Sequence, residues 1–239
     1  MKMKTEPLLF HHVPALLYGP PADRVFLFLH GQCGRKEEAA AFARLAVPAG
    51  FQVLGVDLPG HGERPGVPAD LTPEAAVPEL QEVYAWLAGR WGGVSLRANS
   101  IGAYLGMQAL GGRPLANALF VSPLVGMEAL ILARMAAAGV TEEALRAQGA
   151  AEAGPGEPPL SWAYLCWVRA HPLPAWNTPA QLLCGGRDEL LPRPAAEAFA
   201  AAIHAGLTVY EPGGHWFHTP AQRRALAEWE AAHLLPPSA

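Results

Sequence analysis

The sequence has little charge and few cysteines, and each shortage excludes a class of protein. Charged residues make up 16% of the 239 positions and the formal net charge is -4, so no basic surface for nucleic acid or for an anionic membrane is expected. The three cysteines, Cys33, Cys166 and Cys184, are odd in number and far apart, which argues against a disulfide framework and against a zinc site. Reduced thiols in a cytoplasmic protein are the simpler interpretation.

Long uninterrupted apolar segments are lacking as well. Glu128 and Arg134 interrupt the apolar stretch at 124–135, which is also shorter than the roughly 20 residues that a transmembrane helix needs. No apolar stretch with a cleavage site follows Lys2 and Lys4, so we expect no signal peptide. With an apolar fraction of 51%, the chain is expected to fold as one large globular domain or as a domain with a small insertion.

Short apolar runs that alternate with helical segments predict an α/β fold. Most of these runs have the length and the continuous apolar character of strands buried on both faces of a sheet. The expected fold class is therefore a mostly parallel, doubly wound sheet covered by helices on both faces. Strands are expected at 24–29, 52–58, 118–121, 180–184 and 207–210 and in the run ending at Ser100, edge strands within 8–17, and helices at 36–47, 72–91, 194–204 and 220–233.

The alternation is interrupted between residues 126 and 177. This stretch is helical and alanine-rich without a convincing strand, and residues 149–159 are rich in glycine and proline, which predicts a loop. We interpret 126–177 as a small helical cap inserted into a core formed by 1–125 and 178–239. Four aromatic residues in its second half are expected mainly to pack the cap onto the core, with one or two lining an apolar pocket. They are Trp162, Tyr164, Trp167 and Trp176.

The segment around Ser100 has the composition of a sharp strand-to-helix turn. A strand-like run ends in Ala98-Asn-Ser100-Ile-Gly102, and helix-forming residues follow. Small residues two positions before and after the serine let neighbouring chains pass close by, while the turn exposes the hydroxyl to a base. The following helix would aim its N-terminal N–H groups at negative charge developing beside the serine. The alternative is an ordinary turn whose serine caps the helix.

A serine nucleophile needs a base, and the base needs an acid that fixes its tautomer. Of the four aspartates in the chain, only Asp188 follows Ser100. It comes after an apolar strand and a glycine turn, which places its carboxylate at the carboxyl edge of the sheet. Asp188 is therefore the predicted acid and Glu189 the fallback. An N-cap or an ion pair with Arg187 is the structural alternative.

His215 is the predicted base. Two glycines precede it, just after the strand expected at 207–210, so its loop can bring the imidazole to Ser100. His218 is the competitor, but it adjoins the start of the last helix, where a surface or capping role fits better. The other histidines show no metal-ligand spacing and are expected to be solvated or packed. They include His11, His12, His61, His171, His204 and His233.

Acyl transfer builds negative charge on the carbonyl oxygen, which two backbone N–H groups can stabilise. One expected donor is the amide of Ile101, the residue after the nucleophile. The other is expected in the loop at 30–34, with Gln32 as the best candidate and Cys33 as the second choice. Cys33 would need a lowered pKa to act as a nucleophile itself. The residues expected to line the substrate pocket are Cys33, Trp162, Trp167 and Trp216.

Five short motifs spread over nearly the whole chain combine these features. They are His30-Gly-x-x-Gly34, Asp57-Leu-Pro-Gly-His-Gly62, Ala98-Asn-Ser100-Ile-Gly102, Gly186-Arg-Asp188 and Gly213-Gly-His215. In this order they resemble the α/β-hydrolase family. The resemblance implies an eight-stranded, mostly parallel sheet with a variable cap and catalysis by Ser100, Asp188 and His215.

Two residues depart from the family pattern. Ala98 stands where the first glycine of the turn is usual, a change that a subset of such enzymes tolerates. Arg97 lies in a strand expected to be buried on both faces. Its head group must either reach the edge of the sheet or pair with a carboxylate.

The expected function is hydrolysis of a small carboxylic ester, or of a thioester or amide, through an acyl-Ser100 intermediate. No cofactor or metal is required for these steps, and neither nucleic acid nor membrane is expected as a partner. A serine nucleophile argues against dehalogenases and epoxide hydrolases, which use a carboxylate. Hydrolysis of carbon–carbon or peptide bonds on the same fold, and an inactive binding protein, are the alternatives.

Overall fold

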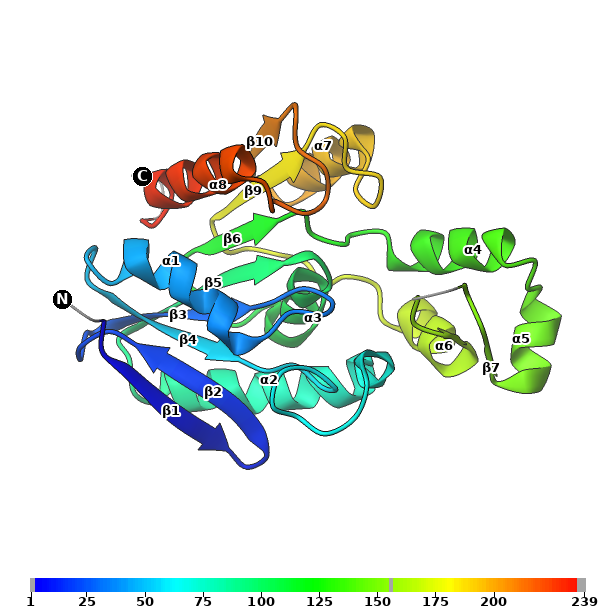
Figure 1. Ribbon diagram of the computed structural model, residues 1–239, viewed down its shortest axis with the longest axis horizontal. Helices are drawn as coiled ribbons and strands as arrows, with labels where there is room; N and C mark the ends of the chain where they lie inside the picture. The colour runs from blue at the N-terminus through cyan, green and yellow to red at the C-terminus, as the bar shows by residue number, and fades with distance from the viewer. Residues whose placement is uncertain (1–2, 155–156, 236–239) are drawn as a thin grey trace.

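The computed structural model describes residues 3–154 and 157–235, which form a central sheet with helices on both faces (Figure 1). The main sheet has eight strands in the order β1-β2-β4-β3-β5-β6-β9-β10. β1 and β2 form an antiparallel hairpin at one edge, β2 pairs antiparallel with β4, and the remaining pairs are parallel. The strands are β1 (Thr5–Phe10), β2 (Val13–Tyr18), β3 (Arg24–Leu29), β4 (Phe51–Val56), β5 (Gly93–Asn99), β6 (Ala118–Val121), β9 (Ala180–Gly185) and β10 (Gly206–Tyr210).

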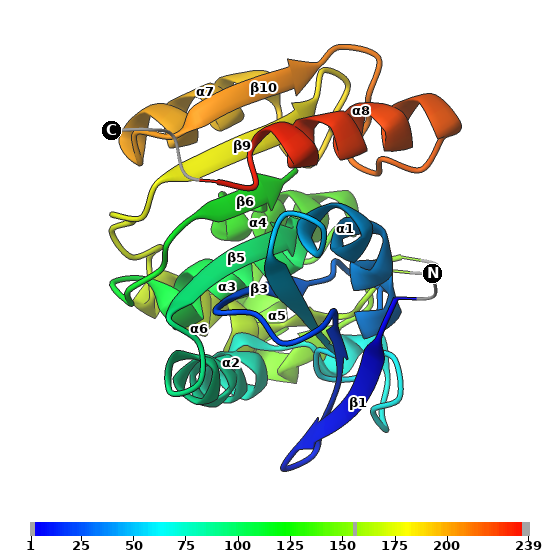
Figure 2. The same cartoon turned by 90° about the vertical axis from the view of Figure 1, so that its left-hand side faces the viewer.

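Helices cover both faces of this sheet (Figure 2). α1 and α8 contact each other on one face, while α2 and α3 pack together on the other, where α7 also lies. The doubly wound α/β fold class predicted from the alternating pattern is confirmed. The helices are η1 (Lys36–Glu38), α1 (Ala39–Ala46), η2 (Pro68–Asp70), α2 (Pro73–Ala88), α3 (Ser100–Leu110), α4 (Met127–Ala137), α5 (Glu142–Gln148), α6 (Trp162–Ala170), α7 (Arg193–Ala202) and α8 (Pro220–Ala232).

The central strands are buried because helices shield both of their faces. All six residues of β4 and all four of β6 are buried, as expected from their mostly apolar sequences. Two apolar layers result. Leu27, Leu96 and Phe120 belong to the layer under α2 and α3, whereas Phe26 and Phe42 belong to the layer under α1 and α8.

Arg97 is the polar exception in this core and is only 1% exposed. Its Nε atom donates to Glu230 Oε1 of α8 at 2.8 Å, and Nη2 lies 2.7 Å from the same oxygen. Of the two arrangements that the sequence left open for Arg97, pairing with a carboxylate is the one observed. The ion pair fixes α8 to the central strand β5.

Residues 126–177 hold α4, α5, α6 and a short antiparallel pair of strands, β7 (Ala150–Ala151) and β8 (Leu160–Ser161). They lie beyond the carboxyl ends of the central strands in Figure 1. The expectation that this stretch contains no strand was wrong, because strands of two residues are too short to produce a periodic pattern. Within the predicted loop at 149–159, residues 155 and 156 lie outside the described part of the chain.

None of the helices in the described residues combines the length and the apolar character that crossing a bilayer requires.

Candidate active site

Three side chains from distant parts of the sequence meet at the carboxyl edge of the sheet. Ser100 Oγ lies 2.8 Å from His215 Nε2, and His215 Nδ1 lies 2.9 Å from Asp188 Oδ1. With the proton on Nδ1, the imidazole donates to the carboxylate and accepts from the serine hydroxyl. The structure therefore brings together the nucleophile, base and acid that the sequence suggested.

Ser100 sits in a strained turn between β5 and α3, with a backbone φ of 47°. This left-handed conformation is uncommon for a residue with a side chain and directs the hydroxyl away from the sheet. Gly102 is needed because a Cβ atom there would lie 2.2 Å from the carbonyl oxygen of His30. Ala98 is completely buried in β5, so a methyl group fits where the family pattern has glycine.

Asp188 is held in the ionised state by its partners. Burial alone would raise its pKa, but the hydrogen bond and the charge of His215, with the amide of Leu191, lower the pKa below its usual value. The amides of Leu190 and Leu191 donate to Oδ1 at 3.0 and 2.9 Å. Glu189, the fallback acid, is exposed instead of facing the imidazole.

The loop after β3 carries the candidate oxyanion donor Gln32. Cys33, the second choice, has its backbone N–H engaged with His61 Nε2 at 2.9 Å and is therefore unavailable. The candidate donors are then the amides of Gln32, in this loop, and of Ile101, the residue after Ser100. Ile101 lies in the first turn of α3, where backbone N–H groups have no intrahelical acceptor.

Two buried histidines support this loop, and the sequence had not indicated such a role. His61 donates from Nδ1 to the carbonyl oxygen of Pro59 at 2.8 Å, which leaves Nε2 to accept from Cys33. His30 donates from Nδ1 to the Gly31 carbonyl oxygen at 2.7 Å and accepts from the Leu58 amide at 3.1 Å. Burial lowers the pKa of His30 to about 4, so it stays neutral. Both lie in the motifs that carried the family resemblance.

A buried ion pair holds the neighbouring turn. Asp57 accepts from the backbone amide and the Nζ atom of Lys36, each at 2.8 Å, and from the amide of Glu63 at 3.0 Å. Burial would lower the pKa of Lys36, but its hydrogen bonds with Asp57, Glu63 and Glu37 raise it well above the usual value. The turn that holds His61 is thereby anchored to η1.

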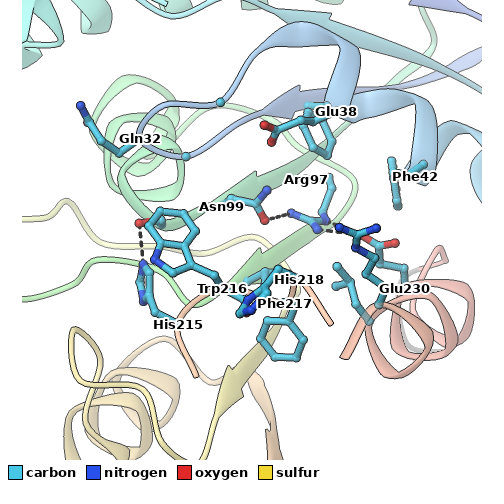
Figure 3. Close-up of a pocket in the computed structure, with 18 of the residues that line it drawn as sticks. Gln32, Glu38, Phe42, Arg97, Asn99, His215, Trp216, Phe217, His218 and Glu230 are labelled. Carbon is cyan, nitrogen blue, oxygen red and sulfur yellow. Dashed lines mark hydrogen bonds and ion pairs between the residues drawn. The ribbon is translucent and has the colours of Figure 1, made fainter. Parts of the chain in front are cut away.

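Ser100 lies between two cavities. One, of about 590 Å³, opens on the side of α1 and α8, and the other, of about 480 Å³, lies beneath residues 126–177. Ser100, Gln32 and Trp216 contact both cavities. Figure 3 shows the first cavity, with His215 and Trp216 toward one end and Arg97 and Glu230 toward the other.

The predicted pocket residues divide into two groups. Trp216 lines both cavities and Cys33 lines the one beside α1. Trp162 and Trp167 are among the lining residues of neither cavity. Trp167 instead stacks on His171, with ring centroids 4.1 Å apart. Tyr164, whose packing role was left open, lines the cavity beneath 126–177.

Within residues 3–154 and 157–235, no three histidine, cysteine, aspartate or glutamate side chains gather in a way that could hold a metal ion.

Comparison with known proteins gives the same family as the motifs. The model of the alpha/beta hydrolase family matches residues 26–229. No curated protein matches the chain significantly.

Several solved structures share the fold at low sequence identity. Est1E from Butyrivibrio proteoclasticus, solved with bound ferulic acid, is 16% identical, with 94% of this chain and 95% of that chain covered and a TM-score of 0.77. A putative hydrolase from Agrobacterium vitis S4 is 16% identical over 98% and 100% of the two chains, with a TM-score of 0.78. An esterase from Exiguobacterium antarcticum is 16% identical over 93% and 96%, with a TM-score of 0.63.

Proposed function

The chain belongs to the α/β-hydrolase family, and from this we propose that it is a serine hydrolase that cleaves a carboxylic ester. The observation that carries the proposal is the continuous contact from Ser100 through His215 to Asp188, at 2.8 and 2.9 Å. Est1E with its bound ferulic acid and the Exiguobacterium esterase share the fold and support an ester as the bond attacked.

The proposed reaction begins with proton transfer from Ser100 Oγ to His215 Nε2 as the oxygen attacks the substrate carbonyl carbon. Asp188 stabilises the imidazolium that forms. The tetrahedral intermediate then collapses, the carbonyl carbon–oxygen bond to the alcohol breaks, and His215 gives its proton to the departing oxygen. Water repeats the sequence on acyl-Ser100, releasing the carboxylic acid and restoring the serine. The same steps cleave thioesters and amides.

The oxyanion would be held by the amides of Gln32 and Ile101. Each such donor contributes about 2.7–4 kcal/mol to the transition state in enzymes of this type. Cys33 and His61 support this assignment, because their hydrogen bond at 2.9 Å fixes the backbone directly after Gln32. No metal or cofactor takes part in any of these steps.

Residues 126–177 are proposed to act as a cap that shapes the substrate cavity. Leu130, Ile131, Leu160 and Tyr164 from this segment line the cavity next to Ser100. A small ester-like molecule fits a cavity of about 480 Å³.

We place the enzyme in the cytoplasm, because its three cysteines are all unpaired.

Replacement of the nucleophile tests the proposal. Ser100→Ala is expected to lower the hydrolysis of short p-nitrophenyl esters by about four to six orders of magnitude, because it removes the hydroxyl that contacts His215 Nε2 at 2.8 Å. A fluorophosphonate probe should label the wild type and not the variant.

Ser95→Ala is the matched control, since Ser95 is also buried and lies on β5, away from the cavities. It should keep the activity and the labelling. Undiminished turnover in Ser100→Ala, with a melting temperature equal to that of the wild type, would refute the assignment of the nucleophile.

A further inference from the structure

The cavity beside α1 and α8 has more charged side chains in its lining than the one beneath residues 126–177. Three arginines and two glutamates from η1, α1, β5 and α8 line it, together with Phe28 and Phe42. In the other cavity, the charged residues Arg134 and Glu157 pair with each other at 2.9 Å, and most of the lining is aliphatic. The five charged residues of the first cavity are Glu38, Arg44, Arg97, Arg223 and Glu230.

These charges do not cancel. Arg97 and Glu230 neutralise each other in a buried ion pair in the lining of the cavity (Figure 3). In the part of the chain that the structure describes, no carboxylate lies within ion-pair distance of Arg44 or Arg223. The negative charge of Glu38 offsets one of the two positive charges of Arg44 and Arg223. With neutral histidines the cavity therefore carries one net positive charge.

Trp216 lines both cavities and lies close to the nucleophile. A Cβ atom added to Gly31 would lie 3.4 Å from the Trp216 ring and 3.4 Å from Ser100 Cβ, so the indole borders the loop beside the serine. The indole also stands edge-on to His215, with ring centroids 4.9 Å apart. An ester whose carbonyl carbon reaches Ser100 Oγ therefore has one cavity available for each of its two substituents, because Ser100 lines both.

We propose that the substrate is an ester with a carboxylate on one side of the scissile carbonyl and a hydrocarbon group on the other. The carboxylate would bind Arg44 and Arg223, because guanidinium groups match carboxylates in charge and geometry. The hydrocarbon group would occupy the aliphatic cavity between Leu124 and Ile131. This inference rests on the proposed function, and it names the substrate class for the same nucleophile.

Two pairs of esters test the inference and locate the carboxylate. The first pair compares kcat/KM for the p-nitrophenyl monoester of glutaric acid with kcat/KM for p-nitrophenyl valerate, and tests whether the carboxylate is recognised in the acyl part. The second pair compares the 3-carboxyphenyl ester of hexanoic acid with phenyl hexanoate, and tests whether the carboxylate is recognised in the alcohol part. In one of the pairs the carboxylate ester should have the higher kcat/KM, and 0.5 M NaCl should reduce the difference.

Single replacements of the two arginines should reduce this preference. Arg44→Gln and Arg223→Gln are each expected to lower kcat/KM for the carboxylate ester by about two- to fivefold, the range of an exposed ion pair, because both arginines are exposed. The neutral ester should be unaffected. Arg224→Gln is the matched control, because Arg224 is the exposed neighbour on α8 and is not a lining residue. Glu38→Gln should increase the preference.

Binding to Ser100→Ala, measured by calorimetry, separates this inference from the proposed function. Suppose that the wild type hydrolyses none of the esters, while Ser100→Ala still binds the carboxylate member of a pair more tightly and this preference requires Arg44 and Arg223. That result would overturn the proposed ester hydrolysis and support the anion site. Equal turnover and equal binding within both pairs would overturn the anion site and leave ester hydrolysis intact. Equal effects of Arg223→Gln and Arg224→Gln would also overturn it.

Discussion

His30 is a neutral, fully buried residue beneath the loop that carries Gln32. Its pKa is about 4 in the folded protein, mainly because burial disfavours the charged ring, against about 6.5 in an unfolded chain. At a pH between these two pKa values, His30 binds a proton in the unfolded state and none in the folded state. Stability therefore falls as the pH decreases from about 6.5 to about 4, by about 3 kcal/mol for this residue in total.

The measurement is the free energy of unfolding by urea at pH 7, 5.5 and 4.5. The difference in free energy of unfolding between the wild type and His30→Gln should decrease as the pH falls through this range, because glutamine does not titrate. His171→Gln is the control, since His171 is exposed. If the wild type and His30→Gln lose stability in parallel, His30 is not the titrating group.

The three residues of the proposed mechanism could be predicted from the sequence, whereas the two buried histidines that support the neighbouring loop could not. Ser100, Asp188 and His215 each follow a recognisable strand, and Asp188 is the only aspartate after the serine. His30 and His61 act by bonding to backbone N–H and C=O groups of nearby turns. Such contacts depend on how the turns fold and leave no spacing pattern in the sequence.

At the scale of single elements, the start of α3 lies unusually close to the loop after β3. A Cβ atom at Gly102 would lie 2.2 Å from the His30 carbonyl oxygen and 3.1 Å from that of Leu29. Backbone atoms cannot give way as a flexible side chain does. Gly102→Ala is therefore expected to destabilise the protein by about 1–3 kcal/mol and to lower esterase activity by displacing Ser100.

Gly89→Ala provides the control for this replacement. The nearest atom to a Cβ at Gly89 is the Ala85 carbonyl oxygen at 3.5 Å, an ordinary contact, and the backbone φ is -80°. Urea denaturation should separate the two variants, and kcat/KM should fall in Gly102→Ala alone. A Gly102→Ala protein with the stability and turnover of Gly89→Ala would contradict the close approach.

The strands of the core could be predicted because most are predominantly apolar runs bounded by turn residues. The expected strand at 52–58 is observed as Phe51–Val56, and the one at 180–184 as Ala180–Gly185. The strands β7 and β8 have two residues each, which is too few to produce a periodic pattern in the sequence. The aromatic residues of 126–177 were recognised, but which of them face a cavity depends on the rotation of α6.

At the scale of the whole molecule, one ion pair joins the last helix to the central strand across 133 positions of sequence. The sequence marked Arg97 as anomalous, but Glu230 resembles any other charged residue of a surface helix. Both side chains are almost fully buried, and Arg97 also bonds to Asn99, the residue before the nucleophile. The pair therefore connects the packing of α8 with the geometry of the turn at Ser100.

Breaking this pair from either side should destabilise the protein strongly. Glu230→Leu leaves the Arg97 guanidinium buried without its carboxylate, and Arg97→Leu leaves Glu230 buried without a cation. Each is expected to lower the free energy of unfolding by about 3–5 kcal/mol. In the double variant both charges are gone, so its loss should be well below the sum of the two single losses.

A double-mutant cycle by urea denaturation measures this coupling, and the exposed pair Arg193–Glu197 provides the comparison. That pair has a similar separation of 2.9 Å, but both side chains are about half exposed, so its removal should change stability little. Additive losses for Arg97 and Glu230 would mean that the two residues stabilise the fold independently. Coupling, together with reduced esterase activity in folded single variants, would show that the attachment of α8 also controls the position of Ser100.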